Sequence, residues 1–541
     1  MSARRLPIRD WLPGYDRALL SGDLAAGIAV TALIVPKNLG YAEIAGVPVQ
    51  NGLYAAAAGA LIYAVFGTCR QISTGPSSGL AAVAGGAVIA TGIAGDDAPQ
   101  LVAAITLVSG VLFVLMWALR LGRISQFLSR AVVTGFLAGA AVDVIIGELP
   151  KLTGTPGGGD NAWQEARDWV RSLGDLNATT LVVGLAALGV ILGLRVLAPK
   201  VPGALVLVVG GLLASAVFDL GAHGVALVGD VPSGLPAPAL PDLDVVGDHL
   251  PTIVIAAAAL LLIGFSQTAG DARAFATRHG YRVDVNQESL AQGMANVGSG
   301  VFQGMPVSTS LSASSLNESA GARTPMASLI TGALVLLTLI ALAPLFSDLP
   351  KAVLAAVIID AVAFGMIDVG ELRRLYRVKR VDFAIAIAAV VAVLSAGVLA
   401  GVVIGVALSL VWLIVVATTP DIPLLEHDGA PGVAVVRPDG GLFFATADGL
   451  HDRLREIVET ADPPVEAVVL DLEGVDFIDS QGAAKLTELA QIARTGHLAL
   501  VLARVKDPVG AVLAAEGVDL PVRDSVHEAV AAAAPAVSPV P

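Results

Sequence analysis

The chain has 541 residues, of which 55% are hydrophobic and only 14% are charged. Soluble domains carry about 25% charged residues, so this composition excludes a wholly soluble protein and an intrinsically disordered chain. The formal net charge of −14 is not the basic signature of a nucleic-acid-binding protein, and the single cysteine excludes intramolecular disulfides and cysteine-rich metal sites. The polar start of the chain contains no apolar run, which predicts no cleavable signal peptide.

Apolar segments separated by short polar breaks fill the chain up to residue 420. A membrane-spanning helix needs about 20 such residues. We therefore predict a polytopic α-helical membrane protein with a cytoplasmic N-terminal segment at 1–21, a transmembrane domain at 22–420 and a cytoplasmic domain at 421–541. The fourteen predicted spans lie near 22–44, 51–67, 76–94, 99–120, 125–148, 178–198, 202–218, 250–273, 286–303, 309–321, 325–346, 350–368, 381–399 and 401–419.

The charges between the spans predict the orientation. With this numbering of spans the basic clusters fall on one side, and the opposite loops are acidic. Lysine and arginine mark the cytoplasmic side, and an even number of spans places both termini there. The basic clusters are Arg4, Arg5, Arg9 and Arg17; Arg120, Arg123 and Arg130; Arg195 and Lys200; Arg273, Arg278 and Arg282; and Arg373, Arg374, Arg377, Lys379 and Arg380. The acidic residues are Asp96, Asp97, Asp219, Asp230, Asp242, Asp244 and Asp248.

The pattern changes after residue 420. Val465–Leu472 (VEAVVLDL) and Leu498–Ala503 are typical of buried strands, and Gly482–Ala493 between them is typical of a helix. Alternating strands and helices predict one small α/β domain.

Two segments interrupt the apolar spans: STGPSSGL at Ser73–Leu80 and GMPVSTSLSASS at Gly304–Ser315. Each contains a proline and small hydroxyl residues, and each is third among the seven spans of its half. Paired interruptions at matching positions point to a transporter site built on an inverted repeat. Half-helices beginning at Pro76 and near Thr309 would turn free N–H groups and positive dipole ends toward an anion. The hydroxyl donors would be Ser77, Ser78, Ser308, Thr309, Ser310 and Ser312. Alternatively, the small residues only let helices pack closely.

Ionisable residues inside spans are costly and usually functional. Lys37 is the cation that we place deep in a span, where it would offset the anion's charge; alternatively it snorkels to an interface. Tyr41 shares its helical face and would line the site or serve packing alone. Asp271 shares a face with Gln267 and would take up a proton or cation, or would pair with Arg273 or Arg278 at the cytoplasmic helix end. Asp143 and Asp360 also lie mid-span without an obvious partner.

Together these segments resemble the SulP family, the sulfate permease or solute carrier 26 type of anion transporters. VPKNLGYAEIAGVPVQNGLY is similar to the family's pattern of Pro-Gln, Tyr-Ala, Ala-Gly-x-Pro and Gly-Leu-Tyr in the first span. FGTCRQISTGPSSGL resembles its Gly-x-x-Arg-x-x-Ser-x-Gly-Pro segment. ARAFATRHGYRVDVNQE and PVSTSLSASSLNESAGARTP resemble the region from the eighth to the tenth span. The C-terminal domain resembles the family's STAS domain, whose fold is similar to anti-sigma-factor antagonists.

The resemblance implies a seven-plus-seven inverted repeat, a core that moves against a gate as an elevator, an anion held between the third and tenth spans, and a homodimer. Carried over by position, the substrate-binding residues would include Lys37, Tyr41, Ser77, Leu311 and Ser312.

The chain departs from the family pattern at three positions. Many relatives have Gln in place of Lys37 and Arg in place of Ala313, so we hypothesise that the site's cation has moved from the tenth span to the first. Relatives coupled to protons or sodium often carry Asp or Glu in place of Gln267, and Asp271, one turn away, would substitute for it.

The STAS-like segment FIDSQG has a serine, Ser480, at the point where anti-sigma-factor antagonists are phosphorylated. Ser480 is a candidate for such regulation or simply the N-cap of the following helix. Gln481 stands where a Ser or Thr would follow, which weakens the regulatory interpretation.

We therefore predict secondary active transport of a small anion, of the sulfate, bicarbonate, chloride or dicarboxylate class, across a bacterial-type inner membrane. The predicted partners are the anion, membrane lipid and a second copy of the chain. No enzymatic activity, metal or cofactor is expected beyond a coupling proton or sodium ion, and no G-x-x-x-x-G-K-[ST] loop is present for ATP. The alternatives are a nucleobase-type permease, an anion channel and a membrane-anchored STAS signalling protein.

Overall fold

A computed structural model describes residues 6–93, 95, 97–121, 129–159, 161–199, 201–426, 432–461 and 464–533. Of the charged residues used above to predict orientation, Arg4, Arg5, Asp96, Arg123 and Lys200 lie outside these described residues. The chain divides into two compact units, Met1–Ser409 and Leu410–Pro541, which are described separately below.

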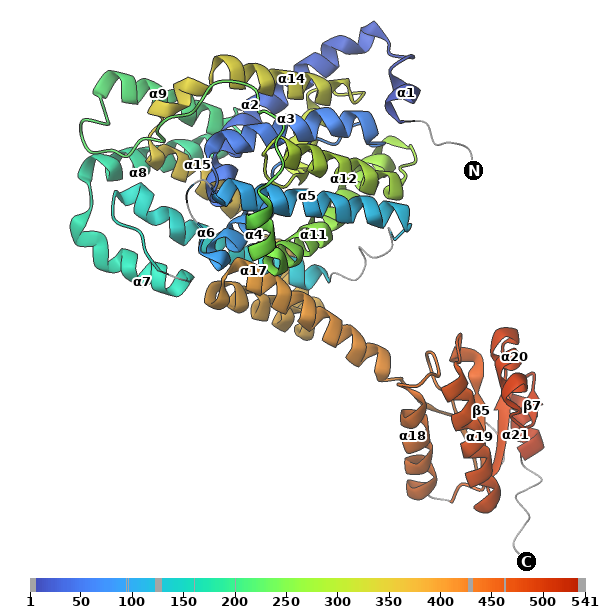
Figure 1. The fold of residues 1–541 in the computed structure, drawn as a ribbon. Helices are drawn as coiled ribbons and strands as arrows, with labels where there is room; N and C mark the ends of the chain where they lie inside the picture. Colours follow the sequence, from blue (N-terminus) through green and yellow to red (C-terminus); the bar gives the residue numbers. More distant parts are fainter. Residues whose placement is uncertain are drawn as a thin grey trace, which may run out of the picture. The chain divides into compact units, whose positions relative to one another are not determined.

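The first unit is a bundle of helices, most of them apolar (Figure 1). Its helices are α1 (Ile8–Trp11), α2 (Leu20–Ile44), α3 (Val49–Phe66), α4 (Ser78–Thr91), α5 (Asp97–Ala118), α6 (Arg130–Thr153), α7 (Ala162–Ser172), α8 (Ala178–Leu197), α9 (Gly203–Phe218), α10 (Leu243–Asp248), α11 (Leu250–His279), α12 (Val285–Val301), α13 (Leu311–Ser319), α14 (Met326–Ala341), α15 (Lys351–Gly365), α16 (Val369–Val378) and α17 (Arg380–Thr418), whose residues from Leu410 on belong to the second unit. Two short strands, β1 (Thr74–Gly75) and β2 (Ser308–Thr309), precede α4 and α13.

Each of the fourteen predicted segments contains helix, once α17 is divided at Gly397. Gly397 has a φ of 83° inside that helix, a value that glycine adopts at little cost and that breaks the helix into two apolar stretches. By length and composition, eight helical stretches among the described residues could each cross a membrane. Shorter apolar helices include α4, α9 and α14. The number of crossings therefore stays a prediction.

Small residues let the helices of this unit approach closely. α12 packs against α5 and α3, and α14 packs against α3 and α2. A Cβ atom on Gly52 of α3 would lie only 2.1 Å from the carbonyl oxygen of Asn38 in α2. Only glycine therefore fits at this crossing, and the backbone of α2 near Asn38 is held firmly against α3.

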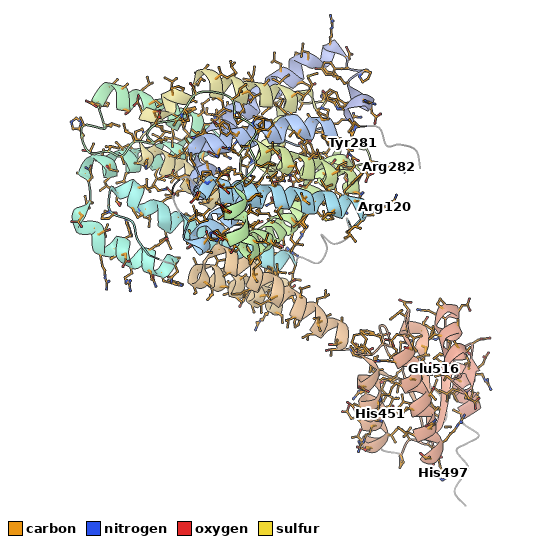
Figure 2. The ribbon with its side chains drawn as sticks, in the orientation of Figure 1. Arg120, Tyr281, Arg282, His451, His497 and Glu516 are labelled. Carbon is orange, nitrogen blue, oxygen red and sulfur yellow. The ribbon has the colours of Figure 1, made fainter. Side chains whose placement is uncertain are left out.

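Two of the basic residues, Arg120 and Arg282, lie at one end of the first unit. Figure 2 shows Arg120 at this end together with Tyr281 and Arg282, which lie more than 160 positions further along the sequence. Basic loops gather on the cytoplasmic side of a membrane, and the orientation of this end stays a prediction.

The described residues of the second unit form a five-stranded sheet in the order β3-β4-β5-β6-β7, in which only the β3–β4 pair is antiparallel. The strands are β3 (Leu424–Leu425), β4 (Val433–Val436), β5 (Ala467–Asp471), β6 (Ala499–Ala503) and β7 (Val522–Arg523). The helices are α18 (Ala447–Thr460), α19 (Ser480–Thr495), α20 (Asp507–Glu516) and α21 (Val526–Ala533). The cores on the two faces of the sheet are separate: α18, α19 and α20 contribute to one and α21 to the other. The prediction of a small α/β domain is confirmed.

Candidate functional site

Both predicted interruptions are breaks in the helical backbone, and they meet. β1 pairs antiparallel with β2, so that Thr74 faces Thr309 and Gly75 faces Ser308. Directly after the strands, α4 begins at Ser78 and α13 at Leu311. Both helices begin two residues later than the sequence predicts, because the residues before them are extended and satisfy their backbone groups across the strand pair.

Side chains of neighbouring helices hold the two strands in place. The carbonyl oxygen of Val307 accepts from Gln292 Nε2 at 2.6 Å and from Asn296 Nδ2 at 2.9 Å, and both donors lie on α12. The N–H of Ser73 donates to Ser314 Oγ of α13 at 2.9 Å. These buried polar contacts bind β1, β2, α12 and α13 into one piece, because a buried polar group that loses its partner is costly.

A small hollow, with a volume of about 20 Å³, lies where α2 faces the starts of the two broken helices. A hollow of this size holds about one water-sized group, so a polyatomic anion such as sulfate would have to widen it. It is lined by Leu33, Ile34, Lys37, Asn38 and Tyr41 of α2, by Ser73, Thr74, Gly75 and Pro76 around β1, and by Ser310, Ser312 and Ala313 at the start of α13.

The structure brings four of the predicted substrate-binding residues to this hollow: Lys37, Tyr41, Ser310 and Ser312. Ser310 is also the N-cap of α13, with its Oγ accepting from the N–H of Ala313 at 3.4 Å. The two hydroxyls that begin α4 lie next to the hollow. Ser77 Oγ is buried and has no hydrogen-bond partner among the described residues, and Ser78 lies within hydrogen-bonding reach of Tyr41.

Three predicted residues have other surroundings. Ser308 Oγ donates to the carbonyl oxygen of Gly264 at 3.2 Å, and Thr309 Oγ1 donates to Asp271 Oδ2 at 2.9 Å. Their hydroxyls are therefore committed to α11 and are not the free donors that we expected. Leu311 does not line the hollow, and 57% of its surface is exposed.

Asn38 lines the hollow but was missed by the sequence analysis, which followed Lys37 and Tyr41 alone. A helix turns 100° per residue, so residues one, four and five apart still share a broad face. The lining residues 33, 34, 37, 38 and 41 follow this spacing. The spacing was therefore the signal that would have found Asn38.

Asp360 has a partner, and the sequence analysis was wrong to find none. Arg195 of α8 donates to both carboxylate oxygens of Asp360 on α15, at 2.9 and 2.7 Å, and its guanidinium lies 4.0 Å from the centre of the Phe364 ring. Within the part of the chain that the structure describes, Lys37 makes no ion pair, although both Asp360 and Arg195 act on its charge. The amine of Lys37 thus lies beside the hollow without an ion-pair partner among the described residues.

The predicted coupling residues, Gln267 and Asp271, lie on α11, which packs against β2. Asp271 is bonded to Thr309 as described above, whereas Arg278, one of its expected partners, pairs with Glu318 at 2.7 Å. Gln267 Oε1 is buried without a partner among the described residues. A change of charge on Asp271 would therefore act directly on the strand that precedes α13.

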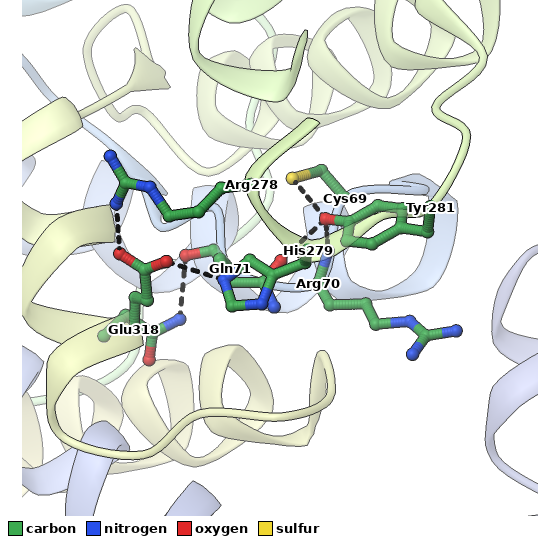
Figure 3. A network of polar contacts seen from close by, with 8 residues as sticks. Cys69, Arg70, Gln71, Arg278, His279, Tyr281 and Glu318 are labelled. Atoms are coloured by element: carbon green, nitrogen blue, oxygen red, sulfur yellow. Dashed lines mark hydrogen bonds and ion pairs between the residues drawn. The ribbon is translucent and has the colours of Figure 1, made fainter. Parts of the chain in front are cut away.

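A polar network at the other end of α13 fixes that helix and the segment leading to β1 (Figure 3). Glu318 of α13 accepts from Arg278 and lies 2.6 Å from His279 Nε2. The Tyr281 hydroxyl donates to Gln71 at 2.6 Å and lies 3.1 Å from the Cys69 sulfur. Burial raises the pKa of the Cys69 thiol to about 11, so this cysteine stays protonated and is a weak nucleophile at neutral pH.

In the second unit, the N-cap of α19 is Asp479 rather than Ser480. Asp479 Oδ1 accepts from the N–H of Gly482 at 2.8 Å, and Ser480 is the first helical residue, with an exposed side chain. The structural interpretation of Ser480 as a cap was therefore wrong, while its proposed phosphorylation is untested.

The chain matches two family models: the sulfate permease family over residues 20–389 and the STAS domain over residues 425–529. A probable sulfate transporter of Mycobacterium tuberculosis is 35% identical over 521 residues, covering 92% of each chain. Mouse solute carrier family 26 member 10 is 31% identical, covering 92% of this chain and 81% of the relative.

Two solved structures are similar in fold. The murine solute carrier 26 family member A9 anion transporter, in its inward-facing state, superposes with a TM-score of 0.87 at 22% identity over 98% of this chain and 96% of that chain. The transmembrane domain of a cyanobacterial bicarbonate transporter, BicA, has a TM-score of 0.63 at 23% identity over 73% of this chain and 98% of that chain.

Proposed function

The chain belongs to the sulfate permease family of anion transporters and ends in a STAS domain, and from this premise we propose that it is a secondary active transporter whose small anion binds at the hollow beside Lys37. The observation that carries the proposal is the β1–β2 pair, which brings Pro76, just before α4, and the first turn of α13 to the same hollow. It is a multi-pass membrane protein and not an enzyme.

Three kinds of favourable interaction would contribute to anion binding at this hollow. The free N–H groups and positive dipole ends of two helices favour negative charge. Lys37 supplies a full positive charge, and the Ser310 and Ser312 hydroxyls supply donors. In surroundings of low polarity, each of these interactions is stronger than it would be in water.

Alternating access would follow an elevator movement of a core against a gate. The core would include α2, α4, α12 and α13 with β1 and β2. The buried contacts of Val307 and Ser73 hold the two strands to α12 and α13. The gate would include α6, α8 and α15, which pack on one another. Because the charges of Asp360 and Arg195 on this second group act on Lys37, the anion would travel at the boundary between the two groups.

Coupling to a proton or sodium ion would act at Asp271, with Gln267 on the same helix. Protonation or cation binding at Asp271 changes the acceptor that holds Thr309, and Thr309 is paired with Thr74 in the strand before the other broken helix. The coupling ion and the anion would thus both act on the β1–β2 pair.

The surrounding architecture completes the proposal. We place the chain in a bacterial-type inner membrane with fourteen spans, both termini in the cytoplasm, a transporter domain at 22–420 and a cytoplasmic STAS domain at 421–541. The grouping of Arg120 and Arg282 at one end of the membrane unit supports this orientation. The chain would act as a homodimer, and phosphorylation at the exposed Ser480 would regulate it.

Uptake of labelled sulfate and bicarbonate into proteoliposomes tests the proposed function. We expect uptake that saturates with anion concentration and responds to an imposed proton or sodium gradient. Uptake that does not saturate, together with unitary currents in electrical recordings, would instead identify an anion channel. If the full chain binds none of sulfate, bicarbonate, chloride and a dicarboxylate, the proposal is contradicted, and the nucleobase-permease and signalling alternatives are left.

A further inference from the structure

The side-chain amide of Asn38 is buried at the hollow and has no part in the anion binding proposed so far. Asn38 is only 2% exposed, and its amide nitrogen has no hydrogen-bond acceptor among the described residues. Burying a donor without a partner weakens a fold, so most such groups in proteins are satisfied. Asn38 lines the hollow, so a group bound there would supply the missing acceptor.

The amide of Asn38 is held in place by its surroundings. Its backbone lies against Gly52 of α3, at the close crossing described above. Pro36, two residues earlier, lies inside α2 and fixes the local backbone angle. A donor positioned in this way loses little freedom when it binds a ligand, so its hydrogen bond contributes most of its strength to affinity.

A second unpartnered donor lies nearby. Ser77 Oγ is also buried without a partner among the described residues, and Ser77 precedes the first residue of α4. The hollow therefore has a positive charge from Lys37 and, around it, donors without acceptors. An anion with strongly accepting oxygen atoms matches this combination, because it needs hydrogen bonds to replace the water that it loses on entry.

We propose that Asn38 is a specificity-determining residue, whose amide donates a hydrogen bond to the bound anion and makes the site prefer strongly accepting oxyanions over weakly accepting anions. This inference rests on the proposed function and adds to it the reason for a preference among anions. A site that hydrogen-bonds part of its ligand rejects a ligand that lacks that group, because the buried donor is then left unpaired. The positive charge of Lys37, by contrast, attracts every monovalent anion alike.

The test measures binding of sulfate, bicarbonate and thiocyanate to the purified full chain by calorimetry at constant ionic strength. Thiocyanate carries one negative charge but accepts hydrogen bonds weakly. For Asn38→Ala we expect the affinity for the better-bound oxyanion to fall about 5- to 100-fold. The affinity for thiocyanate should change less than about threefold, because thiocyanate gains little from the hydrogen bond that the Asn38 amide gives to an oxyanion.

Two further variants separate this role from a structural one. Asn38→Leu has a similar branched shape without donors and should show the same change in preference if Asn38→Ala does not fold. Asn51→Leu is the matched control, because Asn51 is another buried asparagine but its Nδ2 already donates to the Gln303 carbonyl oxygen at 2.5 Å. This control should lower stability and leave the ratio of oxyanion to thiocyanate affinity unchanged.

The outcomes are distinct. A parallel loss of oxyanion and thiocyanate affinity in both Asn38 variants, or no loss in either, would overturn the role of Asn38 while leaving anion transport in place. Absence of binding by the unaltered chain would instead contradict the proposed function itself.

Discussion

Arg195 and Asp360 form a two-point ion pair at 2.9 and 2.7 Å, although 165 positions separate them in the sequence. The pair neutralises the one carboxylate that acts on the charge of Lys37 among the described residues. With Asp360 paired to Arg195, Lys37 lies beside the hollow without an ion pair of its own among the described residues.

Breaking this ion pair should weaken anion binding. In Arg195→Gln, the buried carboxylate of Asp360 loses its partner and becomes a competing counter-ion for Lys37, so we expect sulfate or bicarbonate affinity to fall about tenfold. The second change Asp360→Asn should restore affinity in the same chain, because it removes the competing charge. Calorimetry on the single and double variants checks this, and a double variant no better than Arg195→Gln would contradict the explanation.

Asp271 should set the dependence of transport on its coupling ion. Asp271→Asn retains an acceptor for Thr309 but removes the titratable charge, so anion uptake into proteoliposomes should lose its response to a pH or sodium gradient. Asp382→Asn, in the first turn of α17, is a control that should keep the response. If uptake by Asp271→Asn follows the gradients as before, coupling lies elsewhere.

The docking of α7 onto α6 should weaken as the pH rises. Burial, with the nearby charge of Asp143, raises the pKa of Glu165 from 4.5 to about 7. Glu165 binds its proton more tightly when α7 is docked than when it is undocked. The free energy of docking therefore becomes less favourable as the pH rises from 4.5 to about 7, and stays constant above about 7. Acrylamide quenching of Trp163 and Trp169 on α7 should rise over this range. Glu165→Gln should remove the change, and a pH dependence that persists in this variant would exclude Glu165 as its origin.

Asp471 should be essential to the STAS domain. Its side chain is fully buried and accepts from Arg437 at 2.7 Å and from Arg504. Although burial alone raises the pKa of Asp471, the bonds from the two arginines lower it overall, so the carboxylate is charged at neutral pH. Asp471→Asn should cost about 3 kcal/mol, near the low end for a broken buried pair because both arginines keep 30% of their side chains exposed.

Hydrogen exchange of the β5 amides in the full chain checks this expectation. The control Asp519→Asn breaks an exposed pair with Arg494 and should cost less than about 1 kcal/mol. Equal losses of stability in Asp471→Asn and Asp519→Asn would contradict a larger contribution from the buried pair.

Much of the fold was predictable because its signals are local. Proline with neighbouring hydroxyl residues identified both broken helices, and apolar length identified the helical segments. The exact helix starts were not predictable, because β1 and β2 pair across 235 positions and no local pattern encodes that pairing. The sequence also predicted Ser308 and Thr309 as free donors, because no local pattern shows that residues of α11 accept from both hydroxyls.

The site was predictable only in part. The unusual lysine in an apolar span drew attention to Lys37 and, through helical spacing, to Tyr41. Asn38 attracted none, because an asparagine in a span has no distinctive pattern until its amide is seen buried and unpaired. The partner of Asp360 was equally hidden, since Arg195 lies at the end of a different span.

The central claim, that Lys37 is the cation of the anion site, is tested most directly by the sulfate and bicarbonate affinity of Lys37→Gln, with Lys351→Gln at the start of α15 as the control. The account predicts at least a tenfold loss for Lys37→Gln, a smaller loss at high salt, and recovery when Ala313→Arg returns a positive charge from α13. Unchanged affinity in Lys37→Gln, at low salt and with correct folding, would contradict it.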